Sequence, residues 1–265
     1  MITILFFGDV VGRAGRRAVA EALPVLKRKT HADVVIVNGE NSTHGNGITA
    51  KTYTELRAAG ADLITLGDHA FDREEAKTLL VAEAAHLIRP ANYPPGTPGV
   101  GAQLIPLGTR RLRVGNLLGR VFMKIDTDCP FRTFDAVLKQ YAGQRLAGVV
   151  VDFHAEATSE KQAFGWYADG RAAAVLGTHT HVPTADARIL PRGTAVVADV
   201  GMVGPRDSVI GVSAAASLKG FLQQTPVLLE PADGPCVVGA VAVTIDPESG
   251  RAHAVTRVDI EVAAS

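Results

Sequence analysis

Two histidines, His179 and His181, stand two positions apart shortly after an apolar run that ends at Leu176. In an extended backbone, side chains two positions apart point to the same side, so the spacing predicts that both imidazoles address one small volume. Imidazole is a common metal ligand, and a pair of them at the end of a buried strand indicates a metal site. The alternative interpretation is a turn that carries two solvated histidines.

Ligand-type side chains also follow the other apolar runs of the chain. They are Asp9, the segment Asn38–Asn41, the pair Asp68 and His69, and His154. Ligands of open α/β sheets gather beyond the carboxyl ends of the strands, so we expect these groups to converge with the two histidines. Glycine stands beside Asp9, Glu40 and Asp68, where it allows the backbone to approach an ion closely.

Each of these motifs has a simpler interpretation when it is taken alone. Asp9 could be a helix cap or a turn residue, and Asp68 could cap the segment that follows it. Asn38 with its glycine would form a plain turn, and His154 would be a hydrogen-bonded core histidine. Because the motifs recur in order and mix carboxylate, amide and imidazole groups, we favour a shared metal site.

The first third of the chain alternates short apolar runs with amphipathic segments, which is typical of a βαβ sheet covered on both faces. The predicted strands are Ile2–Phe7, Val34–Val37 and Ala61–Leu66, and the predicted helices are Arg13–Arg28, Ala50–Ala59 and a segment from about Asp72 to Ala84.

The rest of the chain mixes loops, helices and hairpins. Four prolines predict a loop over Leu87–Gly101. Further predicted strands are Gln103–Leu107, Arg111–Leu118, Gly148–Phe153, Ala187–Leu190, Thr194–Val200, Val237–Ile245 and Ala252–Val262, and further helices are Phe131–Gly143, Ser159–Tyr167 with Thr158 as its cap, and Ser213–Leu222. We find no linker, so we expect one domain over residues 1–265, with two sheets packed together and helices outside.

The composition restricts the partners of the chain. Of 265 residues, 27 are Lys or Arg and 27 are Asp or Glu, so the formal net charge is zero. A protein that binds long DNA or RNA usually has a basic excess, so we expect no stable nucleic-acid polymer as partner. Small anionic substrates remain compatible with this charge, because a bound metal supplies positive charge that the residue count does not show.

Other common site types lack their motifs. Cys129 and Cys236 lie far apart and form no disulfide framework. The glycines after Phe7 lack the dinucleotide-binding spacing, and no phosphate-binding loop or serine nucleophile elbow occurs. The apolar run Ile2–Phe7 is too short for a signal peptide or a membrane span, so we expect a cytoplasmic protein without a membrane partner.

The ordered motifs resemble those of the calcineurin-like metallophosphoesterases. Glu40, where most of these proteins have a bridging Asp, makes the chain similar to their YmdB-like branch. Further matches to that branch are Gly8–Gly12, Arg89–Pro94 and Asp199–Met202, so the resemblance spans nearly the whole chain.

This resemblance implies a metallophosphoesterase-like β-sandwich, in which two mixed sheets are flanked by helices in a four-layer α/β/β/α arrangement. It also implies a binuclear phosphodiesterase that cleaves small phosphodiesters or cyclic nucleotides, typically 2′,3′-cyclic ones, by attack of a metal-bridging hydroxide on phosphorus. The expected cofactors are two divalent or mixed-valence ions, iron or manganese, with zinc as a further option. Assembly into a homo-oligomer is left open.

By position, the resemblance implies a role for each ligand. One metal would be held by Asp9, Glu40, Asn41 and His181, and the second by Asp68, His154 and His179, with Glu40 bridging both. His69 would face the substrate as the catalytic proton donor. The alternative for His69 is a residue that orients a metal ligand.

Asp68 departs from the family pattern, which usually has Asn at this position. The formal charges of two divalent ions, three carboxylates and one hydroxide then sum to about zero, rather than about one positive charge. We therefore expect Asp68 to raise the pKa of the bridging water and weaken phosphate attraction, or to favour an oxidised metal such as Fe(III).

Two other functions use the same ligands. One is a metal-containing regulator that binds a nucleotide without significant turnover, and the other is a phosphomonoesterase on the same metal pair. Substrate contacts are less defined: Arg206 could bind phosphate or pair with Asp207, and Asn92 and Tyr93 could line a base pocket or pack within their loop.

Overall fold

The computed structural model describes residues 1–140 and 143–264, and two six-stranded sheets form its centre. The first sheet has the order β15 (Arg251–Arg257), β14 (Ala240–Asp246), β1 (Ile2–Phe7), β3 (Val34–Asn38), β4 (Leu63–Thr65) and β5 (Leu87–Ile88). From β1 to β5 the neighbouring strands are parallel, whereas β14 is antiparallel to both of its neighbours.

The second sheet is mixed in the same way. Its order is β10 (Arg188–Ile189), β11 (Ala195–Val197), β9 (Ala174–Thr178), β8 (Leu146–His154), β7 (Arg110–Leu118) and β6 (Ala102–Leu107). The four strands from β11 to β7 are parallel, and an antiparallel strand closes each edge.

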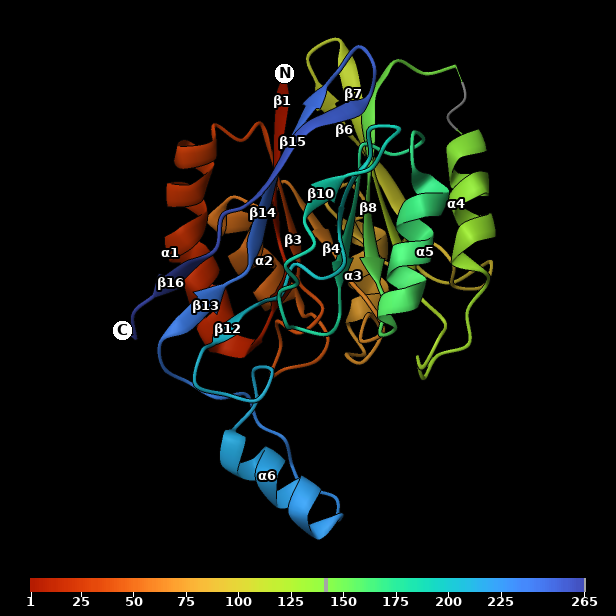
Figure 1. Cartoon of the computed structure of the whole chain (residues 1–265). Helices are drawn as coiled ribbons and strands as arrows, with labels where there is room; N and C mark the ends of the chain where they lie inside the picture. The colour runs from red at the N-terminus through yellow and green to blue at the C-terminus, as the bar shows by residue number, and fades with distance from the viewer. Residues whose placement is uncertain (141–142, 265) are drawn as a thin grey trace.

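The two sheets pack face to face and carry helices on their outer faces (Figure 1). Within β1, Ile4 and Phe6 enter the core between the sheets, while Leu5 and Phe7 belong to the core beneath helices, as the two-residue period of a strand requires. The helices of the first face are α1 (Gly12–Thr30), α2 (Ala50–Ala59) and α3 (Ala76–Ala82), and those of the second are α4 (Pro130–Lys139) and α5 (Thr158–Ala168). The predicted arrangement of two mixed sheets flanked by helices is therefore confirmed.

A third, four-stranded sheet was not predicted. It has the order β16 (Ile260–Val262), β13 (Cys236–Val238), β12 (Met202–Pro205) and β2 (Asp9–Val10). The predicted hairpin is confirmed, because β14 and β15 pair antiparallel across the turn between Asp246 and Arg251. The predicted strands Val237–Ile245 and Ala252–Val262 are not continuous, because each breaks and changes sheet. The first breaks at Gly239, whose N–H donates to the carbonyl of Met202 and fixes the turn between β13 and β14.

Several predicted boundaries also need correction. The loop prediction for Leu87–Gly101 was wrong at its first two residues, which pair with β4 as strand β5. Helix α3 begins at Ala76, because the side chain of Asp72 bonds to His69 and Asn46. Thr158 is the first helical residue of α5 and does not cap it. Of the helix predicted over Phe131–Gly143, residues 141–142 lie outside the described residues.

Helix α6 (Ala214–Gln223) stands away from the sheets, as Figure 1 shows. The Ser213 side chain accepts a hydrogen bond from the N–H of Ala216 and so caps this predicted helix. None of the helices in the described part of the chain is long and apolar enough to cross a membrane.

Candidate metal centre

Four ligand-type side chains meet at the carboxyl ends of the central strands. Among the described residues, ligand atoms of Glu40, Asp68, His154 and His179 lie within 4.8 Å of one another. The Nε2 atom of His154 lies 3.1 Å from Glu40 Oε1, 3.0 Å from Asp68 Oδ1 and 3.0 Å from His179 Nδ1. Carboxylate and imidazole groups converging on one point form a donor set that suits manganese, iron or zinc.

A second group of predicted ligands lies beside this cluster. The Asp9 side chain is fully buried, and its Oδ1 atom lies 3.7 Å from Nδ1 of His154 and 4.0 Å from Nε2 of His181. Within the described chain, Oδ1 of Asp9 and Oδ1 of Asn41 are buried without a hydrogen-bond partner. An unpaired buried acceptor costs about 1–3 kcal/mol, and a cation would satisfy both oxygens, so the residues fit a metal.

The remaining polar atoms of these two side chains are held by the backbone. Oδ2 of Asp9 accepts a hydrogen bond from the N–H of His179 at 3.1 Å, and Nδ2 of Asn41 donates to the carbonyl of Gly45 at 2.9 Å. Each side chain therefore has one fixed atom and one free oxygen. This arrangement orients the free oxygens before any ion binds.

Glycine allows this packing at Gly67, as the sequence predicted. A Cβ atom at this position would collide with the carboxylate of Glu40 and the imidazole of His154. The backbone next to Asp68 thus lies directly against the ligand cluster, an approach that only glycine permits.

The charges of the cluster are strongly coupled. Although burial opposes ionisation, contacts with His154 lower the pKa of Glu40 and of Asp68. Burial also disfavours the charged form of His154, but the carboxylates outweigh it and raise the pKa of His154 well above its ordinary value. A proton on His154 balances these carboxylates in the absence of a cation, so protons and metal compete for the site.

A buried carboxylate, Asp152, fixes the orientation of His154 indirectly. Thr178 Oγ1 donates its only proton to Asp152 Oδ1 at 2.6 Å, so it accepts at 2.8 Å from His154 Nδ1. The Nε2 atom of neutral His154 then faces the cluster with a free lone pair. Burial raises the pKa of Asp152 to about 6, which leaves it mainly ionised at neutral pH.

The His179–His181 segment is not extended, so this part of the sequence prediction was wrong. Strand β9 ends at Thr178, and His179 and His181 have positive φ angles of 101° and 66°. Such backbone costs about 1–3 kcal/mol per residue and persists only where its surroundings impose it. Both imidazoles nevertheless lie at the site, because the turn directs them there.

The residue that holds this turn is Asp199, which is buried. Its Oδ2 atom accepts from the N–H and the hydroxyl of Thr180 at 3.1 and 2.8 Å, and its Oδ1 atom accepts from the N–H of Gly201 at 2.8 Å. The buried ammonium of Lys161 lies 2.6 Å from the same carboxylate. The roles of Asp199 and Lys161 in holding the turn were not predicted from the sequence, although Asp199 belongs to the family-like segment Asp199–Met202.

His69 lies at the rim of the cluster and is half-buried. Its Nδ1 atom is 2.7 Å from Asp72 Oδ2, and its N–H donates to Glu40 Oε2 at 3.2 Å. Burial disfavours the imidazolium, but the charges of Glu40, Asp68 and Asp72 outweigh this effect and raise the pKa of His69. The contact of Asp72 with His69 was not predicted from the sequence, although the three-residue spacing between them was a visible signal.

Two candidate substrate residues have structural partners instead. Arg206 pairs on the surface with Asp207 at 3.1 Å and Glu261 at 2.9 Å. Asn92 is buried and donates to the carbonyl of Leu118 at 2.8 Å, which supports loop packing.

Comparisons with known proteins find relatives that match nearly the whole chain. A family model described as "YmdB-like protein" matches residues 5–258. A protein of Bacillus subtilis (strain 168) named 2′,3′-cyclic-nucleotide 2′-phosphodiesterase is 46% identical over 255 residues, which cover 96% of each chain. A solved structure from Mycoplasma pneumoniae, described as a novel phosphatase, has 35% identity and a TM-score of 0.92 over 99% of this chain and 94% of that one. The structure of a hypothetical protein from Thermus thermophilus has 43% identity and a TM-score of 0.91 over 98% of this chain and 99% of that one.

The hydrogen bond from His154 to Thr178 generates a first prediction. We expect Thr178→Val to weaken Mn²⁺ binding by about 10–100-fold, because the imidazole loses the acceptor that fixes its tautomer. The measurement is calorimetric titration of metal-free protein with Mn²⁺. Thr65→Val is the matched control, since Thr65 donates to the same Asp152 carboxylate at 2.5 Å without contacting His154. Equal Mn²⁺ affinities of the two variants would contradict the tautomer role.

The buried ion pair beside the histidine turn generates a second prediction. We expect the charge-balanced double variant Lys161→Met/Asp199→Asn to bind Mn²⁺ about 10–100-fold more weakly, because Asn cannot accept all three hydrogen bonds that hold the turn. Asp169→Asn is the control. Asp169 is buried and accepts hydrogen bonds from the N–H groups of Arg192 and Thr194, which precede β11, whereas Asp199 follows β11 at the end near the metal ligands. We expect both variants to lower Tm, and a control with equally weakened Mn²⁺ binding would refute the positioning role.

Proposed function

Because the chain belongs to the YmdB-like protein family, we propose that it is a metal-dependent phosphodiesterase that hydrolyses 2′,3′-cyclic nucleotides. The observation that carries the proposal is the pair of unpaired buried oxygens on Asp9 and Asn41, which lie beside a convergent histidine–carboxylate cluster. The name of the Bacillus subtilis relative, at 46% identity over 96% of the chain, supports the substrate class.

We assign the ligands to two neighbouring ions. Asp9, Asn41 and His181 would hold one, Asp68, His154 and His179 would hold the other, and Glu40 would contact both. The lack of a thiolate among these groups favours manganese or iron, with zinc as a further option. When bound, such ions neutralise phosphate charge and activate water for attack on phosphorus.

His69 supplies the proton that the reaction needs in this proposal. Opening the cyclic diester breaks one bond from phosphorus to a ribose oxygen, and the departing oxygen needs a proton to leave as a hydroxyl group. Although burial opposes the imidazolium, the charges of Glu40, Asp68 and Asp72 raise the pKa of His69 and so favour the protonated form that a proton donor needs. The short contact with Asp72 orients the ring, so that the Nε2 atom, 3.9 Å from Asp68 Oδ2, faces the cluster.

We expect metal-stripped protein reconstituted with Mn²⁺ to hydrolyse adenosine 2′,3′-cyclic phosphate, and His181→Ala to abolish this turnover. The measurement is steady-state release of adenosine monophosphate, with metal content determined on the same samples. Absence of turnover with two metals bound per chain would reject the diesterase. A monoester substrate measured in parallel then separates a phosphomonoesterase, as the description of the Mycoplasma structure suggests, from a nucleotide-binding regulator.

We expect His69→Ala to lower kcat about 10²–10⁴-fold while metal content stays near that of the wild type, because a proton donor contributes a factor of this size. Asp72→Asn should cause a smaller loss, since the donor remains but is less well oriented. His253→Ala, an exposed histidine on β15, is the control. Loss of metal in His69→Ala would instead indicate that His69 orients a ligand.

A further inference from the structure

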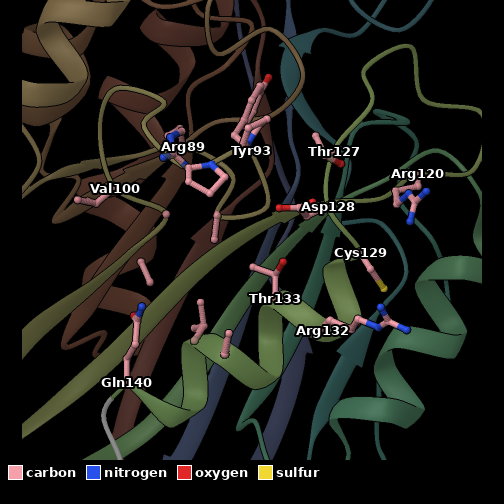
Figure 2. Close-up of a pocket in the computed structure, with 17 residues that line it drawn as sticks. Arg89, Tyr93, Val100, Arg120, Thr127, Asp128, Cys129, Arg132, Thr133 and Gln140 are labelled. Carbon is pink, nitrogen blue, oxygen red and sulfur yellow. The ribbon is translucent and has the colours of Figure 1, made fainter.

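A pocket of about 800 Å³ lies between the segment after β5 and helix α4 (Figure 2). Arg89, Tyr93 and Val100 line one wall, and Arg132, Thr133 and Gln140 line the opposite wall along α4. This volume is within the usual range for a small-molecule site, and it is large enough for a nucleotide unit.

The pocket opens at the edge of the sheets where the metal ligands gather. Arg120, on its rim, follows the end of β7, whose last residue, Leu118, is the register partner of His154. The N–H of Gly119 donates to the carbonyl of His154 at 2.9 Å, which joins the two segments. The rim at Arg120 is thus two residues beyond the strand pair that presents a metal ligand.

Tyr93 forms the border between the pocket and the metal centre. Its ring packs edge-to-face against Phe71, two residues after His69, with 5.3 Å between the ring centroids. Burial first, and then the charges of Asp68 and Glu40, raise the pKa of the Tyr93 phenol. A substrate held at the metal centre therefore has the pocket next to it, across one aromatic side chain.

The charge of the pocket is positive and two of its cations are free. The guanidinium of Arg89 is occupied, because it donates to four loop carbonyls, including those of Pro90 and Pro98. The side chains of Arg120 and Arg132 are exposed and have no hydrogen bond or ion pair within the described chain. Asp128 is the single carboxylate among the described lining residues. Two unpaired guanidinium groups beside a cavity are suited to phosphate.

The chemistry of the substrate decides which phosphate this would be. The 2′ and 3′ oxygens of the ribose carry the cyclic phosphate and must lie at the metals. The 5′ carbon is the position at which a nucleotide chain continues. A second phosphate attached there therefore lies outside the metal centre, beyond the ribose. A terminal 5′-phosphate and the linking phosphate of a short oligonucleotide share this chemistry.

We propose that the pocket binds a second phosphate on the 5′ side of the cyclic phosphate, through Arg120 and Arg132. This inference rests on the proposed function and narrows its substrate class to 5′-phosphorylated nucleotides or short oligonucleotides that end in a 2′,3′-cyclic phosphate. The neutral net charge of the chain agrees with a short ligand rather than a nucleic-acid polymer.

The test compares three substrates: adenosine 2′,3′-cyclic phosphate, its 5′-phosphorylated form, and the dinucleotide that ends in the same cyclic phosphate. We expect kcat/KM to be about 10-fold higher for the 5′-phosphorylated form, the size of a charge-assisted contact, and to lose this preference at high salt because exposed charges are screened. In the double variant Arg120→Ala/Arg132→Ala, the ratio of the two kcat/KM values should fall to about one. The dinucleotide shows whether a linking phosphate is accepted as well as a terminal one.

Arg188→Ala is the matched control, because Arg188 is exposed, lies over the ring of Trp166 and does not line the pocket. A wild type that treats the three substrates equally, or a preference that survives in the double variant, would overturn the proposal. Ala136→Phe adds a test without a change of charge. The larger side chain on α4 reduces the volume of the pocket and should raise KM most for the dinucleotide.

Binding measurements keep this inference separate from the proposed function. If no substrate is turned over, the proposed function fails, but the Mn²⁺-loaded protein should still bind adenosine 3′,5′-bisphosphate about 10-fold more tightly than adenosine 3′-phosphate. The double variant should lose this difference in calorimetry. Equal affinity of the wild type for the two nucleotides would reject the pocket.

Discussion

The buried carboxylate of Asp152 is the interaction on which the site depends. It accepts hydrogen bonds from Asn38 and Thr65, which end strands β3 and β4 of the first sheet, and from Thr178, which ends β9 of the second. An ionised carboxylate is costly to bury, and three donors in this position offset much of that cost. Because the donors belong to both sheets, Asp152 fixes the distance between the strand ends, and through Thr178 it also sets the orientation of His154.

The positions of the ligands could be predicted from the sequence, but the conformation of their supports could not. Asp9, Glu40, Asp68 and His154 each follow an apolar strand, and parallel strands place their carboxyl ends at one edge. The turn at His179–His181 depends instead on Asp199, which is paired with Lys161 at 38 residues' separation. No local pattern reports such a pairing, so an extended backbone was the natural but wrong expectation.

The same contrast between local sequence patterns and tertiary contacts explains why the third sheet and the pocket along α4 were not predicted. Periodicity identified most strands of the two large sheets but not the short β5. It also could not show that the chain changes sheet at Gly239, because both halves of that segment are apolar. The pocket along α4 was also invisible in the sequence. Arg120 and Arg132 stand in an irregular segment and at the start of a helix, and a net charge of zero conceals their local excess. Fold patterns therefore locate strand ends, whereas tertiary contacts decide which charges remain free.

The ligand set on its own carries unfavourable terms that a bound cation would remove. The free oxygens of Asp9 and Asn41 are buried, and the two histidines of the turn have positive φ angles. The packing of the surrounding sheets offsets these costs and keeps the ligand side chains in place before an ion binds. Binding therefore requires less ordering of these side chains. A ligand that binds only the folded chain stabilises it by RT ln(1 + [L]/Kd), or about 2.7 kcal/mol at one hundred times Kd. The stability of this edge of the sandwich is thus coupled to metal occupancy, and the same geometry that makes the ligand set costly by itself makes it selective for a cation.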